Sequence, residues 1–494
     1  MDGTGTGKNR TQTSMNGKLR LIATKYNQLP VQAKSSLWFA ICNMLQRGLG
    51  MLTTPIFTRL FTTEEYGVFS LYNAWEQLLI LLLALPLFQA LYNLYVKYED
   101  KNMVLSAVVG LNITVCLFWG LVYFVLRDWV VRLLNMPEML CDLMFMQLLV
   151  QPIITNWTVH QSFFYNYKKM AMVSLSSSFI SVIASLAAVL LASSNLVEHR
   201  VGANLCVIGV IAFILLSQVI KSNKRLYNRE IWLFTLAFCI PLLPHFLSEF
   251  ILSTSDRMMI GYFCTKTDVA LYSVAYSFAM LLTLLTSSIN ASFVPFQTRK
   301  ISERDYAKLS PLAIGVYIFL AFALSALMLL GPEVIFIFGG KKYESAIWVI
   351  PPICLGVFFS YMFQIFARVE QLFEKKLYLV SATLISALLN IILNMIFIPI
   401  YGYVAAAYTT LVCYICLCFT HYYFYIKVCN QCLEGARIYD VKLIVNVSMG
   451  LVGFTSLIYV TYSYADIVRY AMLVLLAGFA IANLKRIKLI LSFN

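Results

Sequence analysis

Apolar runs long enough to cross a bilayer alternate with short polar segments along the chain from Ser36 onward. A hydrocarbon core of about 30 Å needs about 20 apolar residues in a helix. Two such runs, 36–60 and 66–96, form the first predicted helix pair, and Pro86 interrupts the second of them. Twelve more are predicted at 103–126, 138–160, 171–193, 201–220, 231–262, 270–298, 310–331, 345–367, 377–399, 403–426, 441–461 and 467–484. The pattern predicts an all-α polytopic membrane protein with 14 transmembrane helices.

The composition supports this fold class. Hydrophobic residues make up 60% of the chain and charged residues only 12%, whereas about 25% charged residues is usual for a soluble domain. The net charge is +14, but the basic residues stand in small groups at the ends of the apolar runs and form no single patch. We therefore expect a lipid surface, and not nucleic acid, as the anionic partner.

The distribution of Lys and Arg predicts the orientation in the membrane. The side that holds the N-terminus carries 27 of the 37 basic residues, and the other side carries eight. The positive-inside rule places the basic side, and with an even number of spans both termini, in the cytoplasm. Residues 1–34 carry six of these basic residues and are predicted to be a disordered cytoplasmic segment.

Two pairs of similar segments indicate an internal repeat. Residues 168–174 and 375–381 share the pattern KKxxxVS, and residues 61–70 are echoed by 263–273. The offsets predict two six-helix lobes, 35–225 and 226–428, which share one orientation because each has an even number of spans. Residues 429–494 then hold an additional helix pair and a cytoplasmic C-terminus.

Twelve cysteines include two Cys-x-x-Cys pairs, at 413–416 and 429–432, with a spacing that mimics a zinc ribbon. The first pair lies inside an apolar run, where thiols pack as small hydrophobic groups. We predict structural cysteines and no metal site.

Ionisable side chains within the predicted helices are the candidates for function, because a charge at the bilayer centre costs about 2.5–3.5 kcal/mol. They are Arg47, Glu76, His160, His245, Glu249, Asp256 and Arg257. Without gaps, the repeat places Arg47 and Glu249 at equivalent positions, so that they face each other across a central cavity. Pro241 and Pro244 predict a bend in the seventh helix. These features are typical of an alternating-access transporter.

Each candidate also has a structural interpretation. Arg47 could bond backbone carbonyls with Glu249 as its counter-ion, and Asp256 and Arg257 could form an interfacial pair. The histidines could pack between helices, and Arg59, at the outer end of the first helix, could reach for the lipid headgroups.

Residues 54–70, TPIFTRLFTTEEYGVFS, resemble the segment that joins the first two helices of polysaccharide repeat-unit flippases. These belong to the multidrug/oligosaccharidyl-lipid/polysaccharide exporter superfamily, and residues 338–343 and 398–402 also resemble it. The resemblance implies two six-helix lobes around a cationic cavity and a groove for a lipid tail at the additional helix pair. It further implies that undecaprenyl-diphosphate-linked oligosaccharide moves from the cytoplasmic to the outer leaflet of a bacterial inner membrane.

Arg47 matches a cavity arginine of related flippases, and a guanidinium can pair with diphosphate oxygens. The predicted substrate-binding residues are Arg47, Arg59, His160, His245 and Arg257. The predicted ion-coupling residues are Glu76, Glu249 and Asp256, with H⁺ or Na⁺ as the coupling ion and no other cofactor. These acidic residues leave open whether the glycan is acidic or neutral.

The expected partners are the lipid-linked oligosaccharide, membrane lipids and other polysaccharide assembly proteins. Two alternatives stay open. A multidrug/cation antiporter of the same superfamily would favour twelve spans and a cavity without a central arginine. A membrane polymerase or glycosyltransferase would need a large external loop, which the pattern lacks, so we predict a transporter and not an enzyme.

Overall fold

The computed structural model describes residues 30–307, 309–464 and 466–483, and its secondary structure is helical. The α-helices are α2 (Val31–Leu60), α3 (Thr63–Leu79), α4 (Leu91–Lys97), α5 (Lys101–Leu134), α6 (Glu138–Phe163), α7 (Tyr167–Leu191), α8 (Leu196–Ser222), α9 (Arg229–Cys239), α10 (Leu243–Phe263), α11 (Lys266–Ser302), α12 (Leu309–Leu329), α13 (Gly331–Gly339), α14 (Ile350–Leu372), α15 (Lys376–Tyr401), α16 (Tyr403–Cys432), α17 (Val441–Tyr464) and α18 (Asp466–Ala482). Shorter turns are η1 (Ile80–Ala84), η2 (Leu87–Ala90), η3 (Ile240–Leu242) and η4 (Lys341–Val349).

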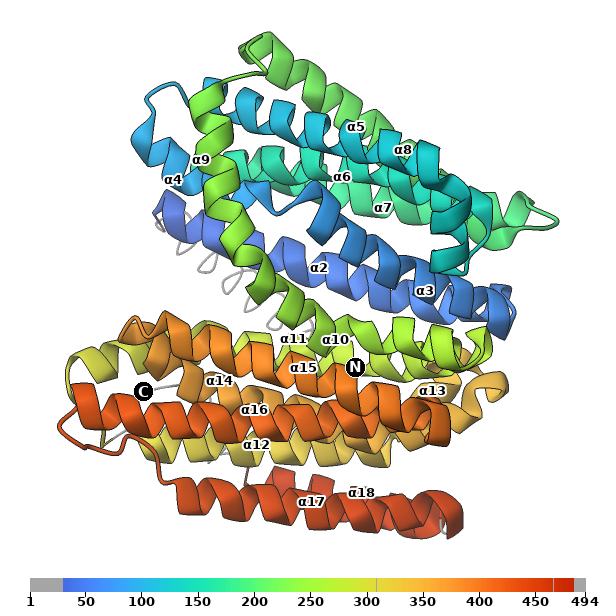
Figure 1. Ribbon diagram of the computed structural model, residues 1–494. Coiled ribbons are helices and arrows are strands. Elements are labelled where there is room, and N and C mark those ends of the chain that lie inside the picture. Colours follow the sequence, from blue (N-terminus) through green and yellow to red (C-terminus); the bar gives the residue numbers. More distant parts are fainter. Residues whose placement is uncertain (1–29, 308, 465, 484–494) are drawn as a thin grey trace, which may run out of the picture.

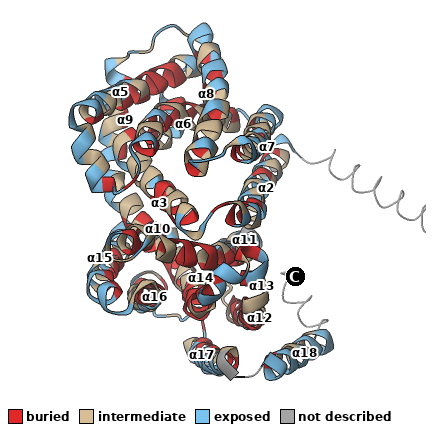
Figure 2. Ribbon diagram, turned by 90° about the vertical axis from the view of Figure 1, so that its right-hand side faces the viewer, coloured by how far each residue is buried: buried red, intermediate tan, exposed pale blue. Residues whose placement is uncertain are grey.

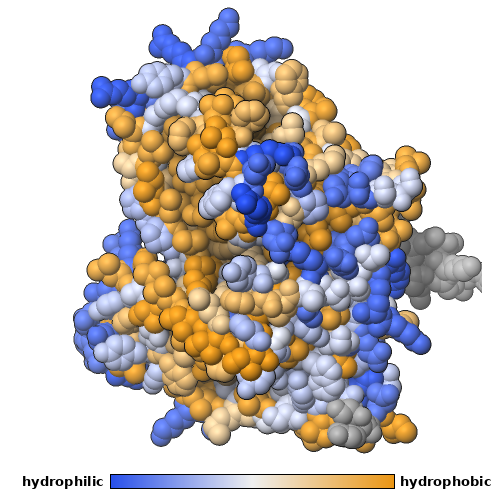
Figure 3. Space-filling model, turned by 45° about the vertical axis from the view of Figure 1, so that its right-hand side comes forward, coloured by the Kyte–Doolittle hydropathy of each residue, from blue (hydrophilic) through white to orange (hydrophobic). Residues whose placement is uncertain are grey.

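Among the residues that the structure describes, every predicted apolar run coincides for most of its length with helical structure, and the chain is a multi-pass membrane protein. Within the described residues, twelve segments are long and apolar enough to cross a bilayer. Helices α2 and α18 are not among these twelve: α2 carries polar residues such as Asn43 and Gln46, and α18 has only 17 residues. The count of 14 spans therefore stays a prediction. Hydrophobic side chains cover much of the face of the molecule that Figure 3 shows.

The helices form two bundles that lie one above the other in Figure 1. We call α2–α9 the N-bundle and α10–α16 the C-bundle. The predicted bend in the seventh apolar run is present, because α9 ends at Cys239 and α10 begins at Leu243 beyond the turn that holds Pro241. Trp232 Nε1 of α9 donates to Ala107 O of α5 at 2.8 Å, whereas α10 packs on α15. The seventh run thus joins the two bundles, with one half packed in each.

The second run is broken near Pro86, where the sequence also placed an interruption. Helix α3 passes into the π-helical turn η1, and Leu85 then has a positive φ of 59°. Asn112 of α5 donates to Ala84 O at 2.8 Å, which satisfies a carbonyl that the break leaves free.

The internal repeat is visible in the way α3 and α11 begin. Thr62 caps α3 with Glu65 three residues later, and Thr265 caps α11 with Asp268 in the same reciprocal geometry. These two capping boxes lie in residues 61–70 and 263–273, the similar segments that indicated the internal repeat. Figure 1 shows both helices starting at the same end of the molecule, as a parallel repeat requires.

The two bundles are in contact at the face opposite the start of α2, which we call the far face; the face where α2 starts is the N face. Helices α3 and α11 pack so closely there that a Cβ on Gly67 would lie 1.8 Å from Lys266 O. Thr58 Oγ1 donates to Phe338 O at 2.5 Å, and Lys342 Nζ donates to Phe61 O at 2.5 Å. We call these contacts the far-face seal.

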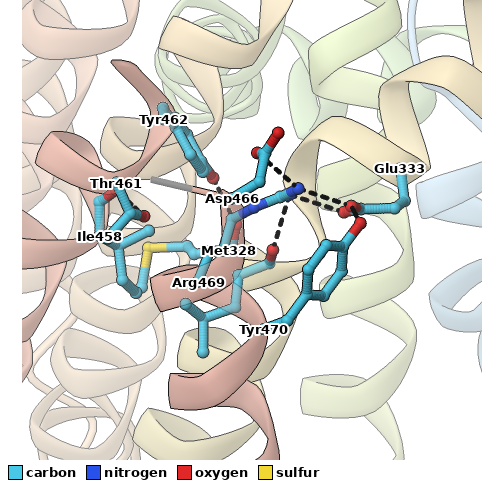
Figure 4. A network of polar contacts seen from close by, with 9 residues as sticks. Met328, Glu333, Ile458, Thr461, Tyr462, Asp466, Arg469 and Tyr470 are labelled. Atoms are coloured by element: carbon cyan, nitrogen blue, oxygen red, sulfur yellow. Dashed lines mark hydrogen bonds and ion pairs between the residues drawn. The ribbon is translucent and has the colours of Figure 1, made fainter. Parts of the chain in front are cut away.

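Helices α17 and α18 lie outside the C-bundle, next to α12 (Figure 2). Arg469 of α18 holds this pair in place with two hydrogen bonds to the carboxylate of Glu333, at 2.7 and 2.8 Å, and a third to Leu329 O at 3.1 Å (Figure 4). Tyr470 donates to the same carboxylate at 2.5 Å. One buried guanidinium thus joins α18 to α13 and to the end of α12.

We expect Arg469→Gln to lower the free energy of unfolding by about 2 kcal/mol or more, because hydrogen bonds to charged groups contribute about 1.5–3 kcal/mol. Thermal unfolding of the purified protein measures the change. Arg304→Gln is the matched control, since Arg304 and Glu434 are 67% and 82% exposed and such pairs contribute about 0–1 kcal/mol. Equal melting temperatures for the two variants would contradict the role of Arg469.

Candidate functional site

A cavity of about 820 Å³ lies between α2 and the C-bundle and includes the N-face ends of α14 and α15 in its wall. The charged and imidazole side chains in its wall come from five helices. They are Arg47, His245, Glu249, Arg368, Lys376 and His421. Three permanent cations thus face one carboxylate. We call this space the C-cavity.

Arg47 is exposed on the wall of the C-cavity and forms no hydrogen bond or ion pair with any residue that the structure describes. Glu249 is 61% exposed, and its Oε1 lies 3.7 Å from Nε2 of His245. Arg47 and Glu249 line the same cavity, where the repeat had placed them, yet they are not paired. The free guanidinium is available to an anionic ligand.

A second cavity, of about 620 Å³, lies within the N-bundle between α2, α6, α7 and α8; we call it the N-cavity. A pocket of about 180 Å³ adjoins it toward the far face and shares Thr53, Ser181 and Arg200 with it. Glu76 lines this pocket and accepts a hydrogen bond from Gln147 Nε2. The N-cavity and its pocket run from the N face toward the far-face seal.

Arg200 lies where the N-cavity and the pocket meet. Its guanidinium carbon is 3.6 Å from the ring centroid of Phe57 and 3.5 Å from that of Phe69. Cation–π contacts on both faces hold the guanidinium in place. Its Nη1 is buried without an acceptor in the described structure. In the sequence, Arg200 stands just before the predicted run 201–220, and the apolar pattern therefore did not indicate it as a cavity residue.

Asp256 is buried in the C-bundle, with 1% of its surface exposed. Its carboxylate accepts hydrogen bonds from Tyr272 Oη at 2.5 Å, Asn394 Nδ2 at 2.8 Å and Thr410 Oγ1 at 2.9 Å. These donors come from α11, α15 and α16, so four helices meet at one carboxylate. Arg257 is not ion-paired to it among the described residues, which removes the predicted interfacial pair.

Three predicted substrate-binding residues do not line either cavity. Arg257 lies 4.4 Å from the ring centroid of Tyr276, and Arg59 donates to Pro55 O of its own helix at 2.8 Å. His160 Nδ1 lies 2.8 Å from Tyr95 Oη in a buried aromatic cluster. Of the three, His160 packs between helices, as its alternative interpretation had it. We assign none of the three a substrate contact.

The structure also shows ionisable residues that the sequence analysis missed. Glu370 and His421 are 0% and 1% exposed, and Glu370 Oε1 lies 2.9 Å from His421 Nδ1. Glu370 had been placed beyond the end of its predicted helix. Arg368 and Lys376 had been counted as loop cations, but they line the C-cavity.

The two Cys-x-x-Cys pairs both lie on α16. At 1.5 Å rise per residue they are about 24 Å apart along the helix, too far to bind one ion together. In the part of the chain that the structure describes, no three His, Cys, Asp or Glu side chains form a metal-binding group.

Solved structures with the same arrangement of helices are transporters. The lipid II flippase MurJ in an inward closed conformation is 16% identical, with a TM-score of 0.63, and the match covers 91% of this chain and all of MurJ. A multidrug resistance MATE family transporter in an inward-facing conformation is 13% identical, with a TM-score of 0.53 over 81% of this chain and 96% of the other. At these identities the likeness concerns the fold.

One relative and two family models also match the sequence. The Lsg locus putative protein 1 of Haemophilus influenzae is 20% identical over 332 residues, which cover 64% of this chain and 80% of that protein. The family model MatE matches residues 241–396. A second family model, described as polysaccharide biosynthesis protein, matches residues 32–300, more than half of the chain. The chain therefore belongs to the polysaccharide biosynthesis protein family.

Proposed function

We propose that the protein is a flippase that moves a polyprenyl-diphosphate-linked oligosaccharide across the membrane by alternating access. The observation that carries the proposal is the free guanidinium of Arg47 in a cavity that reaches the N face, while the bundles are joined at the far face. A diphosphate is the ligand that a free arginine and two further cations favour. The resemblance to repeat-unit flippases makes undecaprenyl the expected lipid.

Several features of the surrounding structure support this proposal. The basic N face is the cytoplasmic side under the positive-inside rule, so the cavities are open to the side where the substrate is made. We place the protein in a bacterial inner membrane with both termini in the cytoplasm. An apolar groove of about 360 Å³ between α12, α17 and α18 is proposed to hold part of the lipid tail.

Asp256 is our candidate for the ion-coupling site. Its carboxylate accepts hydrogen bonds from amide and hydroxyl groups of three other helices, and a carboxylate can bind a proton or a hard cation. Because its partners come from α11, α15 and α16, a change in the charge at this point would act on the packing of the whole C-bundle. Glu249 lines the C-cavity, Glu76 lines the pocket that adjoins the N-cavity, and both are further proposed coupling residues.

We expect Asp256→Asn to abolish the dependence of flipping on an imposed Na⁺ or H⁺ gradient while the protein still folds, because the amide keeps the shape of the side chain and removes its charge. Flipping is measured in proteoliposomes with each gradient separately. The matched control is Asp440→Asn, an exposed carboxylate that caps α17. Gradient-dependent flipping by the Asp256 variant would move the coupling site to Glu249 or Glu76.

The alternative is a multidrug/cation antiporter, which the MatE match over residues 241–396 favours. The two functions require opposite charge in the cavity, and the cations of the C-cavity disfavour a cationic drug. Wild-type protein in liposomes decides between them: one assay follows a fluorescent polyprenyl-diphosphate oligosaccharide, the other a lipophilic cationic dye. Transport of the dye alone would refute the flippase proposal.

A further inference from the structure

The two cavities differ in their chemistry. Within the described residues, Arg200 is the only charged side chain in the wall of the N-cavity, whereas the C-cavity has three cations and a carboxylate. The rest of the polar wall of the N-cavity consists of amides and hydroxyls, for example Asn43, Gln151, Thr155 and Ser177. Such groups bind uncharged polyhydroxyl ligands through hydrogen bonds.

Resting on the proposed flippase function, we propose that the N-cavity binds the sugars of the substrate and that Arg200 and Glu76 at its far end contact the distal sugar. The diphosphate then lies in the C-cavity. Helix α2 joins the two sites, because Arg47 faces the C-cavity while its neighbour Gln46 faces the N-cavity. One extended ligand can thus contact both along a single helix.

Arg200 has an unfilled hydrogen-bonding position. Phe57 and Phe69 hold the guanidinium in a fixed orientation, and its buried Nη1 has no acceptor among the described residues. A buried donor without a partner costs about 1–3 kcal/mol, and more when the group is charged. A sugar oxygen that reaches Nη1 would remove this cost, so the site favours a ligand long enough to reach the end of the cavity.

The same pocket selects against charge on the distal sugar. Glu76 and Arg200 line one pocket with opposite charges. A hydroxyl can donate to the carboxylate and also accept from the guanidinium, so a neutral sugar satisfies both groups. A uronic acid at this position would place its carboxylate near Glu76, and an amino sugar would place its ammonium near Arg200. The inferred substrate class is a lipid-linked oligosaccharide with an uncharged distal sugar.

The test uses three probes in proteoliposomes: a polyprenyl diphosphate with one sugar, with a neutral tetrasaccharide, and with the same tetrasaccharide oxidised to a uronic acid at its distal end. All carry the fluorophore on the first sugar, and flipping is read with a membrane-impermeant quencher. We expect Arg200→Gln to reduce the flipping rate of the neutral tetrasaccharide probe at least about tenfold relative to that of the monosaccharide probe. Arg132→Gln is the control, since Arg132 is exposed and donates to Asp128 O of its own helix.

Glu76→Gln provides an independent variant. It is expected to raise the flipping rate of the acidic tetrasaccharide probe relative to the neutral one, because the repulsion between Glu76 and the uronic acid carboxylate is removed. The proposal is overturned if Arg200→Gln slows the monosaccharide and the tetrasaccharide equally, if wild type prefers the acidic probe, or if Glu76→Gln leaves the preference unchanged. Failure of wild type to move any of the three probes would instead refute the flippase function itself.

Discussion

Replacing Arg47 by glutamine is expected to reduce flipping of every diphosphate-linked probe by a factor of 100 or more, whatever sugar it carries. The guanidinium is exposed on the wall of the C-cavity and has no partner among the described residues. Its full hydrogen-bonding capacity is therefore available to the diphosphate, and charge-assisted bidentate pairs are among the strongest polar contacts in proteins. Truncating one partner of a charge pair costs about 2–5 kcal/mol where the pair is buried, as it would be if the bound substrate covers Arg47.

The measurement is the initial rate of flipping in proteoliposomes with matched amounts of inserted protein. Arg59→Gln is the control on the same helix, because Arg59 lies outside both cavities and bonds to Pro55 O. Arg47→Lys keeps the charge but not the planar fork, so we expect an intermediate rate. A wild-type rate for Arg47→Gln would exclude Arg47 from the substrate site and leave Arg368 and Lys376 as the candidates.

Gly67→Ala is expected to open the far face. A Cβ at this position would lie 1.8 Å from Lys266 O, so α3 and α11 must separate by about 1 Å or more. Backbone cannot be displaced as easily as a flexible side chain, and overpacking of this kind typically costs about 1–3 kcal/mol. This free energy destabilises only the conformation in which the two bundles are in contact at the far face. A shift of this size changes the ratio of the two states by about five- to 150-fold.

Accessibility of a cysteine at Ala270 measures this shift, because Ala270 is buried in α11 one turn from the seal. A membrane-impermeant thiol reagent added at the far face should label it faster in Gly67→Ala than in the parent. Labelling of the native cysteines is measured with the same protein without the introduced cysteine, and this is the background signal. Gly120→Ala is the matched control, since nothing lies within 4 Å of a Cβ there. Equal labelling in all variants would show that these contacts do not keep the far face closed.

The helical architecture was predictable because it depends on local properties of the chain. Hydrophobic runs of bilayer length mark the helices, and Pro86, Pro241 and Pro244 mark breaks, because proline removes a backbone donor at its own position. The repeat was visible because equivalent helices begin with equivalent caps, at Thr62 and Thr265. The beginnings of helices were less certain, and α2 starts at Val31, five residues before the predicted run.

The residues of the candidate site could be predicted from the sequence only where a charge stood deep within an apolar run. Arg47 and Glu249 were identified in this way, and both line the C-cavity. Arg200, Arg368 and Lys376 were not, because they stand at the ends of apolar runs, where a basic residue usually contacts headgroups or water. Whether such a side chain turns inward depends on the helices packed around it, and no local pattern records this.

The sequence by itself determined the class of the protein, the position of its helices, the internal repeat and one cationic residue of the cavity, because hydrophobicity and helical period act over neighbouring residues. Only the tertiary structure decided which charges share a cavity, that Arg200 is held between two phenylalanines, that Glu370 and His421 are paired, and that the bundles meet at the far face. These features arise from contacts between helices far apart in the chain, and the direction of each side chain at such a contact is set by its packing.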